Sequence, residues 1–480
     1  MPVRRFAGRL PLDRVFHLSE RGTTLGTEIR GGSTTFVVMA YIVFVNPTIL
    51  STLTQGQGPP FAATVTMTAL TAGVMTLLMG IYTNYPFAMA SGLGLNAFVA
   101  FDMILGRGIP WQAAMGVVFI EGTLITLLVL AGLRRAVMDA IPLSLKQAMS
   151  VGIGLFILFI GLVNAGFVQV PVESIAIVDG RAAGQPSPPI TLGTLIGWPI
   201  AVALVGLFLT ILLVARRVRG ALLVGILGAT AVAVVAHAIT GADMSAAPGV
   251  QGGFPDELAR PSFETFGQGL NFDIFVDVAV LTAVLLIFSM MLSDFFDSMG
   301  SVIGVGSEAG FLDRQGRLPR IDRVLLVDSA AAAFGGIASA SSVTTYVESS
   351  AGVSEGARTG LASIVTGLLF LAAILLAPVA GIVPAEATAP ALIVVGFLMA
   401  SVIREIDFRR FDVGFPALLT ITVMPFTFSI TNGIGAGFVV HTFVSIATGR
   451  WRSLHWLMYL ISAAFMLYFS LDWIEGWFDL

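Results

Sequence analysis

Pro86-Phe-Ala-Met-Ala-Ser-Gly-Leu-Gly-Leu-Asn96 and Ser339-Ala-Ser-Ser-Val-Thr-Thr-Tyr-Val-Glu348-Ser-Ser-Ala-Gly352 interrupt two apolar segments at matching places in the two halves of the chain. Glycine, serine and β-branched residues form membrane helices poorly, so each segment is predicted to begin extended and to end as a short helix. Non-helical backbone survives inside a membrane only against protein or a wet cavity. The pair therefore predicts a substrate site where the two breaks meet, and two ordinary kinked helices are the alternative.

The composition around these segments requires lipid as the solvent. Of 480 residues, 56% are hydrophobic and 11% charged, and the mean hydropathy is +0.92. The chain has no cysteine, and its four histidines are scattered, at positions 17, 237, 441 and 455. Disulfides, thiolate metal sites and cysteine nucleophiles are excluded, so we expect no metal, no cofactor and no enzyme activity.

The apolar runs predict an all-α polytopic membrane protein with about fourteen spans, since each run can cross about 30 Å of hydrocarbon. Seven spans in each half would give the halves opposite orientations, which is the inverted-repeat plan of many transporters. The first repeat is residues 31–240, with spans at 31–51, 62–82, 86–105, 111–133, 143–164, 196–215 and 220–240. The second is 274–449, with spans at 274–303, 324–338, 343–354, 357–378, 388–403, 413–430 and 433–449.

Arginine placement orients these spans. Of the 25 Lys and Arg residues, all but Arg107, Arg181 and Arg260 fall on one side if residues 1–30 are a cytoplasmic segment. The positive-inside rule then predicts a multi-pass protein of the plasma (inner) membrane with a cytoplasmic N-terminus. No apolar run precedes residue 32, so no cleaved signal peptide is expected. The apolar segment at 450–480, mainly 454–473, either spans or lies at the interface.

Ionisable residues inside the spans are the candidate functional groups. Asp294 and Asp297 lie three residues apart and share one helix face, and Glu348 lies in the broken tenth span. An acid at mid-bilayer costs about 2.5–3.5 kcal/mol, so these acids are expected to face a cavity, find donors or carry a proton. With the amide of Asn96 they suit a flat heterocycle with mixed donor and acceptor edges. Candidates to stack on such a ring are Phe36, Phe295 and Tyr346.

Five segments together make the chain similar to a known family. It resembles the azaguanine-type purine permeases, the adenine/guanine/hypoxanthine branch of the nucleobase-cation symporters and of the xanthine-uracil permease superfamily, over nearly its whole length. The segments are Thr34-Thr-Phe-Val-Val-Met-Ala-Tyr-Ile-Val-Phe-Val-Asn46-Pro47, Gly92-Leu-Gly-Leu-Asn96-Ala-Phe, Asp294-Phe-Phe-Asp297, Thr344-Thr-Tyr-Val-Glu348-Ser-Ser-Ala-Gly352 and Ala389-Pro-Ala-Leu.

The resemblance implies a core domain, residues 31–133 with 274–378, that moves against a gate domain, residues 143–240 with 388–449. It implies proton-coupled import of purine bases by a homodimer. The basic stretch 311–323, which could suggest nucleic-acid or anionic-lipid binding, is interpreted as an inside loop, so no nucleic-acid partner is expected. Carried over position by position, Asn96, Asp294 and Glu348 are expected to bind the substrate, and Asp297 to be the acid of the transport cycle. The preferred purine, and sodium as the coupling ion in place of the proton, stay open.

Two other classes stay as alternatives. A sulfate-permease-type anion transporter would share the architecture, but its site should present helix N-termini without three acids. An intramembrane aspartyl protease also needs two membrane aspartates, but on separate helices, and here both lie on one helix. A channel or a purely structural membrane protein is a further alternative. Counterflow of a labelled purine in proteoliposomes separates all of these from the transporter.

Overall fold

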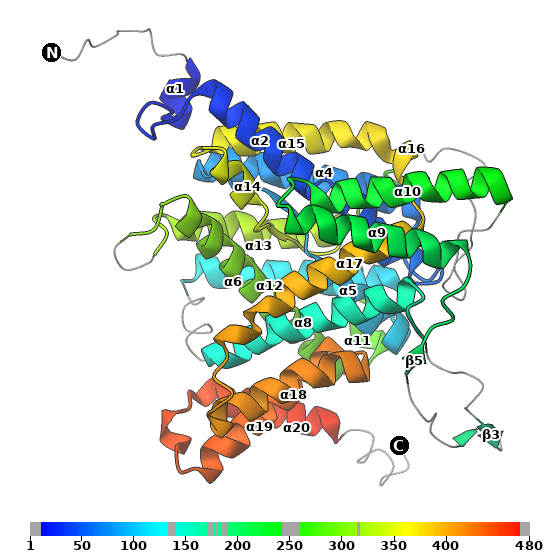
Figure 1. The fold of residues 1–480 in the computed structure, drawn as a ribbon. Coiled ribbons are helices and arrows are strands. Elements are labelled where there is room, and N and C mark those ends of the chain that lie inside the picture. The colour runs from blue at the N-terminus through cyan, green and yellow to red at the C-terminus, as the bar shows by residue number, and fades with distance from the viewer. Residues whose placement is uncertain are drawn as a thin grey trace.

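The computed structural model describes residues 11–132, 141–169, 176–178, 181–183, 190–241, 260–313 and 317–470. In this part of the chain, nine helices are long and apolar enough to cross a membrane, and four further apolar helices are shorter. Most helices lie nearly parallel in one bundle, with α1 and α2 at one edge and α18 to α20 at the other (Figure 1). The all-α membrane fold expected from the sequence is confirmed.

The first repeat contains the predicted seven spans. After α1 (Pro11–Phe16), the chain continues through α2 (Leu25–Met39), α3 (Ile42–Pro47), η1 (Thr48–Thr52), α4 (Phe61–Thr83), β1 (Met89–Ser91), α5 (Leu93–Ala97), η2 (Phe98–Leu105), α6 (Trp111–Leu130), α8 (Leu143–Asn164), α9 (Trp198–Ala215) and α10 (Ala221–Thr240). Between α8 and α9, β2 (Val168–Gln169) pairs with β5 (Thr191–Leu192), and β3 (Ala176–Val178) with β4 (Arg181–Ala183).

The second repeat follows the same order. Its elements are α11 (Ile274–Asp277), α12 (Val280–Glu308), α13 (Ile321–Ile337), β6 (Val343–Thr345), α14 (Ser349–Ser354), α15 (Gly360–Ala373), η4 (Ile374–Leu376), α16 (Ala377–Ala380), α17 (Ala385–Ala400), η5 (Ser401–Glu405), α18 (Phe411–Thr427), α19 (Ile430–Ala447), η6 (Trp451–Ser453) and α20 (Trp456–Phe469). The eighth span runs to Glu308, five residues beyond its expected end.

Prolines and glycines explain how α8 and α17, the fifth span of each repeat, form and pack. Each helix begins directly after a proline, Pro142 and Pro384, which costs no helical hydrogen bond there. The two helices pack on each other where Gly154 and Gly396 meet. A Cβ added to Gly396 would lie 2.5 Å from the Gly154 carbonyl oxygen, so only glycine permits this approach.

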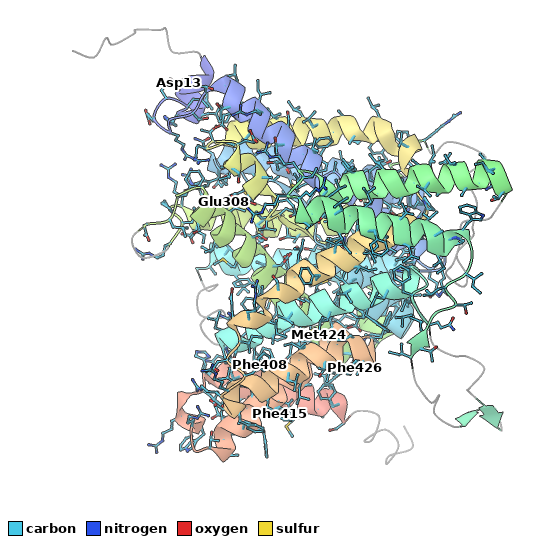
Figure 2. The ribbon with its side chains drawn as sticks, in the orientation of Figure 1. Asp13, Glu308, Phe408, Phe415, Met424 and Phe426 are labelled. Atoms are coloured by element: carbon cyan, nitrogen blue, oxygen red, sulfur yellow. The ribbon has the colours of Figure 1, made fainter. Side chains whose placement is uncertain are left out.

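The helices form two groups. In one group, α15 packs on α2 and α4, and α13 packs on α4 and α6. In the other, α17 packs on α8, α9 and α10, while α18 packs on α8 and α19. These groups correspond to the core and gate of the transporter fold, and their exact residue boundaries stay predictions. Along the outside of α18, Phe415 and Phe426 are 39% and 79% exposed, which suits a surface against lipid (Figure 2).

The C-terminal helix α20 runs along α19 in the opposite direction. Ser462 and Thr442 share a hydroxyl hydrogen bond of 2.7 Å, and the Tyr468 hydroxyl donates to Asn432 Oδ1 at 3.3 Å. Fourteen residues of helix span about 21 Å. The segment thus lies alongside a membrane-crossing helix, and whether it completes a fifteenth span involves residues 471–480, which lie outside the described part.

Candidate functional site at the crossing of the broken spans

The two interrupted segments cross at the middle of the bundle. The strands β1 and β6 pair antiparallel, with Met89 opposite Thr345 and Ser91 opposite Val343, and all six residues are buried. Their two half-helices, α5 and α14, lead away toward opposite ends of the bundle. The predicted plan of a short strand followed by a half-helix is confirmed in both repeats. The N-termini of α5 and α14, and the backbone groups that the β1–β6 pairing does not use, therefore lie at the same depth in the bundle.

Buried side chains hold the strands in this position. The Thr76 hydroxyl accepts from the Met89 N–H at 2.9 Å. Asp328, 4% exposed in α13, accepts at Oδ1 from the Thr345 N–H at 2.9 Å and from the Thr345 hydroxyl at 2.7 Å. Gly92 follows β1, and a Cβ there would lie 2.8 Å from Thr344 Cγ2. Close packing and a buried acid therefore replace the missing helical hydrogen bonds.

Two of the predicted site residues, Asp297 and Glu348, lie beside the crossing, and Asp297 alone of the two lines the cavity between the helix groups. Asp297 lines a small cavity together with Ser293 and Phe296 of its own helix. Glu348 immediately precedes α14, and its Oε1 accepts a hydrogen bond of 2.8 Å from the Tyr41 hydroxyl. Asp297 is close enough to Glu348 and Asp328 for their charges to interact. The crossing thus gathers several acids around one point.

The other two predicted residues lie deeper in the core. Asn96, in α5, is 0% exposed, and Asp294, in α12, is 1% exposed. Neither lines the cavity at Asp297. Among the described residues, neither amide atom of Asn96 has a hydrogen-bond partner. An unpartnered buried polar group costs about 1–3 kcal/mol, so this amide is a group that a ligand or a water molecule would satisfy.

The cavity at Asp297 lies between the two helix groups. Its volume is about 20 Å³, and its walls come from α5 and α12 on the core side and from α8 and α17 on the gate side. The residues that complete the wall are Gly94, Leu95, Met149, Ser150, Ile153 and Met399. A cavity of this size holds one water molecule and no purine base.

Three contributions at this site were not expected from the sequence. Tyr41 is the partner of Glu348, and Asp328 anchors β6. The aromatic residue at the cavity is Phe296, the neighbour of the expected Phe295, which packs edge-on against it at 5.6 Å. Phe36 packs edge-on against Phe370, away from the cavity's wall. Adjacent residues of a helix point in different directions, so Phe296 and Phe295 lie on different faces of α12. A helical-wheel count that starts from Asp297 would have separated the two candidates.

Comparison with known proteins identifies the family. Residues 26–436 match the Xan_ur_permease model, described as Permease family. The chain belongs to this permease family. It is 37% identical over 461 residues to adenine permease AdeP of Escherichia coli, covering 96% of each chain. It is also 37% identical over 459 residues to guanine/hypoxanthine permease PbuG of Bacillus subtilis, covering 95% of this chain and 98% of that one. The resemblance to azaguanine-type purine permeases is confirmed, and the permease is a transporter rather than an enzyme.

Solved structures show the same fold at low identity. The transmembrane domain of the cyanobacterial bicarbonate transporter BicA aligns with a TM-score of 0.59 and 13% identity, covering 86% of the permease and 97% of that chain. The murine anion transporter Slc26a9 in its inward-facing state aligns with a TM-score of 0.59 and 13% identity, covering 93% and 74%. At this identity the likeness concerns architecture alone, and it supports the inverted repeats with core and gate.

Proposed function

We propose that this permease imports purine nucleobases together with protons across the plasma (inner) membrane, with its N-terminus in the cytoplasm. The observation that carries the proposal is the crossing of β1 and β6, with Asp297 in the cavity between core and gate and Glu348 close enough for the two charges to interact. The curated relatives are named as permeases for adenine and for guanine and hypoxanthine, which supports a purine as the cargo. Positive-inside charge placement supports the orientation, and the family resemblance supports a homodimer.

The substrate would bind where ring N–H groups meet carboxylate and amide oxygens. Glu348, already oriented by Tyr41, would accept from a ring N–H. Asn96 and Asp294 would complete the polar wall from within the core, because a buried amide without protein partners gains from a ligand. A base needs far more room than the 20 Å³ beside Asp297. Binding therefore requires α5 and α12 to separate from α8 and α17, which is movement of core against gate.

Asp297 would carry the coupled proton. It lies within α12, a helix long and apolar enough to cross a membrane, and close to the charges of Glu348 and Asp328. Acids inside membrane spans often mark proton relays, which supports this role. Proton uptake from one side and release to the other would then accompany each passage of the base. Sodium in place of the proton is the alternative coupling ion, and the ion gradients of the experiment below separate the two.

Transport by purified protein in proteoliposomes tests the proposal. We expect an imposed inward proton gradient to drive accumulation of labelled hypoxanthine, and Asp297→Asn to abolish accumulation while it retains exchange of labelled for unlabelled base. Asp407→Asn, at an exposed loop, is the matched control and should behave as wild type. Accumulation driven by a sodium gradient alone would overturn proton coupling. Movement of sulfate or bicarbonate without any purine exchange would overturn the cargo.

A further inference from the structure

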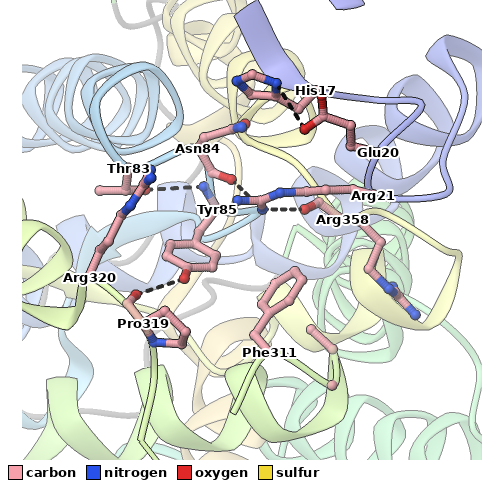
Figure 3. Close-up of a pocket in the computed structure, with 12 residues that line it drawn as sticks. His17, Glu20, Arg21, Thr83, Asn84, Tyr85, Phe311, Pro319, Arg320 and Arg358 are labelled. Carbon is pink, nitrogen blue, oxygen red and sulfur yellow. Dashed lines mark hydrogen bonds and ion pairs between the residues drawn. The ribbon is translucent and has the colours of Figure 1, made fainter. Parts of the chain in front are cut away.

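A second, larger cavity opens at the end of the bundle that carries the N-terminal segment. Its volume is about 730 Å³, and none of its lining residues lines the cavity at Asp297. Four separate stretches build it: the α1–α2 connection, the end of α4, the α12–α13 connection and the α14–α15 connection. Side chains that define its character are His17, Arg21, Tyr85, Phe311, Arg320 and Arg358 (Figure 3).

Arg21 is a fixed cation in this cavity. Its Nη1 donates to the carbonyl oxygens of Asn84 and Arg358, both at 2.8 Å. Its guanidinium carbon lies 5.3 Å from the ring centre of Tyr85 and 5.6 Å from that of Phe311. The Tyr85 hydroxyl in turn donates to the Pro319 carbonyl at 2.7 Å. The guanidinium is therefore oriented before any ligand arrives, with donors beyond Nη1 still available.

Arg320 supplies a second cation on the other side of Tyr85 (Figure 3). No hydrogen bond or ion pair engages its guanidinium within the described part of the chain. Its backbone is left-handed, with φ 54° and ψ 30°, a conformation that is unfavourable for a residue other than glycine. Burial lowers the pKa of Arg21, and the charge of Arg320 acts in the same direction. An anion between these two arginines would relieve their repulsion.

The acids nearby leave this positive charge largely unopposed. Glu20, the acid on the wall, is already 3.3 Å from His17 Nδ1. Glu28 lies behind the wall and is 0% exposed. Its carboxylate accepts from the backbone N–H groups of Arg358, Thr359 and Ala362 at 2.8, 3.3 and 3.3 Å. The cavity thus presents the side chains of Arg21, Arg320 and His17 against one paired glutamate, while the Arg358 guanidinium points away and donates to the carbonyls of Val353 and Ala357 (Figure 3).

We propose that this cavity is a binding site for a phosphate group, held between Arg21 and Arg320. Guanidinium groups bind phosphate oxygens in bidentate fashion, and two of them on opposite sides match a tetrahedral anion with several acceptors. A volume of about 730 Å³ accommodates a mononucleotide or the head group of a phospholipid. The bound anion would join the N-terminal segment to the α12–α13 connection, both of which belong to the core side.

Binding of AMP to purified protein in a neutral detergent is the first test. We expect AMP to bind, adenosine not to compete, and affinity to fall steeply with added salt because the contacts are ionic. Arg320→Gln should weaken AMP at least 10-fold, and Arg320→Lys should recover only part of that loss, because an ammonium group keeps the charge but not the bidentate geometry. Arg323→Gln is the matched control, since Arg323 is an exposed arginine three residues later that lies over Tyr82 and not on the cavity wall. Saturating hypoxanthine should not displace AMP, which separates this site from the transport site.

Thermal stability of the protein in nanodiscs is the second test. Thermal stabilisation of wild type by phosphatidylglycerol over phosphatidylcholine, lost in Arg320→Gln and kept in Arg323→Gln, would assign the phosphate to a lipid head group. AMP binding with no such lipid effect would assign it to a soluble phosphate ester. Equal binding of both probes to wild type and Arg320→Gln, or binding of neither probe, would overturn the site. None of these readouts uses transport, so failure here leaves the proposed import of purines untouched.

Discussion

The Glu348 carboxylate is oriented by a phenol from the first span. Tyr41 is 1% exposed, and its hydroxyl makes the 2.8 Å hydrogen bond to Oε1. Removing that hydroxyl removes a bond to a charged group, worth about 1.5–3 kcal/mol, and frees the carboxylate to rotate. We therefore expect Tyr41→Phe to raise the KM for hypoxanthine about 10-fold, measured by initial uptake rates into proteoliposomes.

The matched control for this change is Tyr459→Phe. That tyrosine donates to the Trp451 carbonyl beyond the end of α19, away from the crossing, and is half-buried. Uptake by the control should match wild type. An unchanged KM in Tyr41→Phe, with protein of normal stability, would show that the hydroxyl does not orient a substrate-binding group.

Residue identity alone could predict the acids but not their partners. Asp297 and Glu348 stand out in the sequence because charged residues are rare in apolar spans. Tyr41 does not stand out, because a tyrosine within an apolar run is common, and it is 307 residues away from Glu348 along the chain. Asp328 lies near the start of a span, where an acid suggests a helix end near water. Only the fold shows that it anchors Thr345.

At the scale of elements, the sequence predicts the broken spans well because the signal is local. Glycine, serine and threonine in the two interrupted segments weaken the helix at those positions, and both became strands of three residues. The residues that pack against the crossing cannot be identified from the sequence near it. The gate side of the cavity comes from Met149, Ser150, Ile153 and Met399, and three of these are apolar residues of a kind that occurs throughout the chain. Their role follows from the packing of α8 on α17, which needs the three-dimensional arrangement.

Close approach of α5 to α8 makes Gly94 a test of core movement. A Cβ at Gly94 would lie 2.6 Å from Ile153 Cγ2 on the gate side, a distance that real Cβ atoms do not adopt. Overpacking of this kind costs about 1–3 kcal/mol, and here it falls in the arrangement in which the two groups are in contact. We expect Gly94→Ala to reduce the maximal uptake rate about 10-fold or more, with thermal stability lowered by a few degrees.

Gly300→Ala serves as the control, because nothing lies within 4 Å of an added Cβ at that helical position. Alanine there improves helix propensity by about 1 kcal/mol, so stability should be equal or higher and uptake normal. The double variant Gly94→Ala with Ile153→Ala removes the Cγ2 methyl group that crowds the added Cβ. Recovery of uptake in that double variant would locate the defect at this contact, and a Gly94→Ala protein that transports normally would refute the close approach.

At the scale of the whole molecule, polar contacts join core to gate at both ends of the bundle. At one end, the buried Asp102 accepts from Arg107 Nε at 2.9 Å, from the Ser429 hydroxyl at 2.8 Å and from the Thr431 N–H at 3.1 Å. At the end that carries the N-terminal segment, Glu355 pairs with Arg30 at 2.9 Å and also with Arg219.

These two links differ in strength. Arg219 is 61% exposed, and an exposed ion pair contributes about 0–1 kcal/mol. Asp102 is 1% exposed and keeps Arg107 within the core, but on opening it would lose the hydrogen bonds from Ser429 and Thr431, each worth about 1.5–3 kcal/mol because the acceptor is charged. We infer that the end with Glu355 opens more readily, which is the cytoplasmic side in the orientation proposed above.

Because the chain has no cysteine, a pair of introduced cysteines can be cross-linked selectively, and this tests the movement. Two such pairs that share position 355 are compared. Glu355 contacts Arg219, in the α9–α10 connection of the gate group, and Arg30, in α2 of the core group. In the double variant Glu355→Cys with Arg219→Cys, a short bis-methanethiosulfonate reagent should stop hypoxanthine uptake, and reduction should restore it, because the cross-link ties two groups that must separate. The pair Glu355→Cys with Arg30→Cys joins residues of one rigid group, so the same reagent should leave uptake within about twofold of the unreacted protein. Full uptake by a completely cross-linked 219–355 pair would mean that the core does not leave the gate at this end during transport.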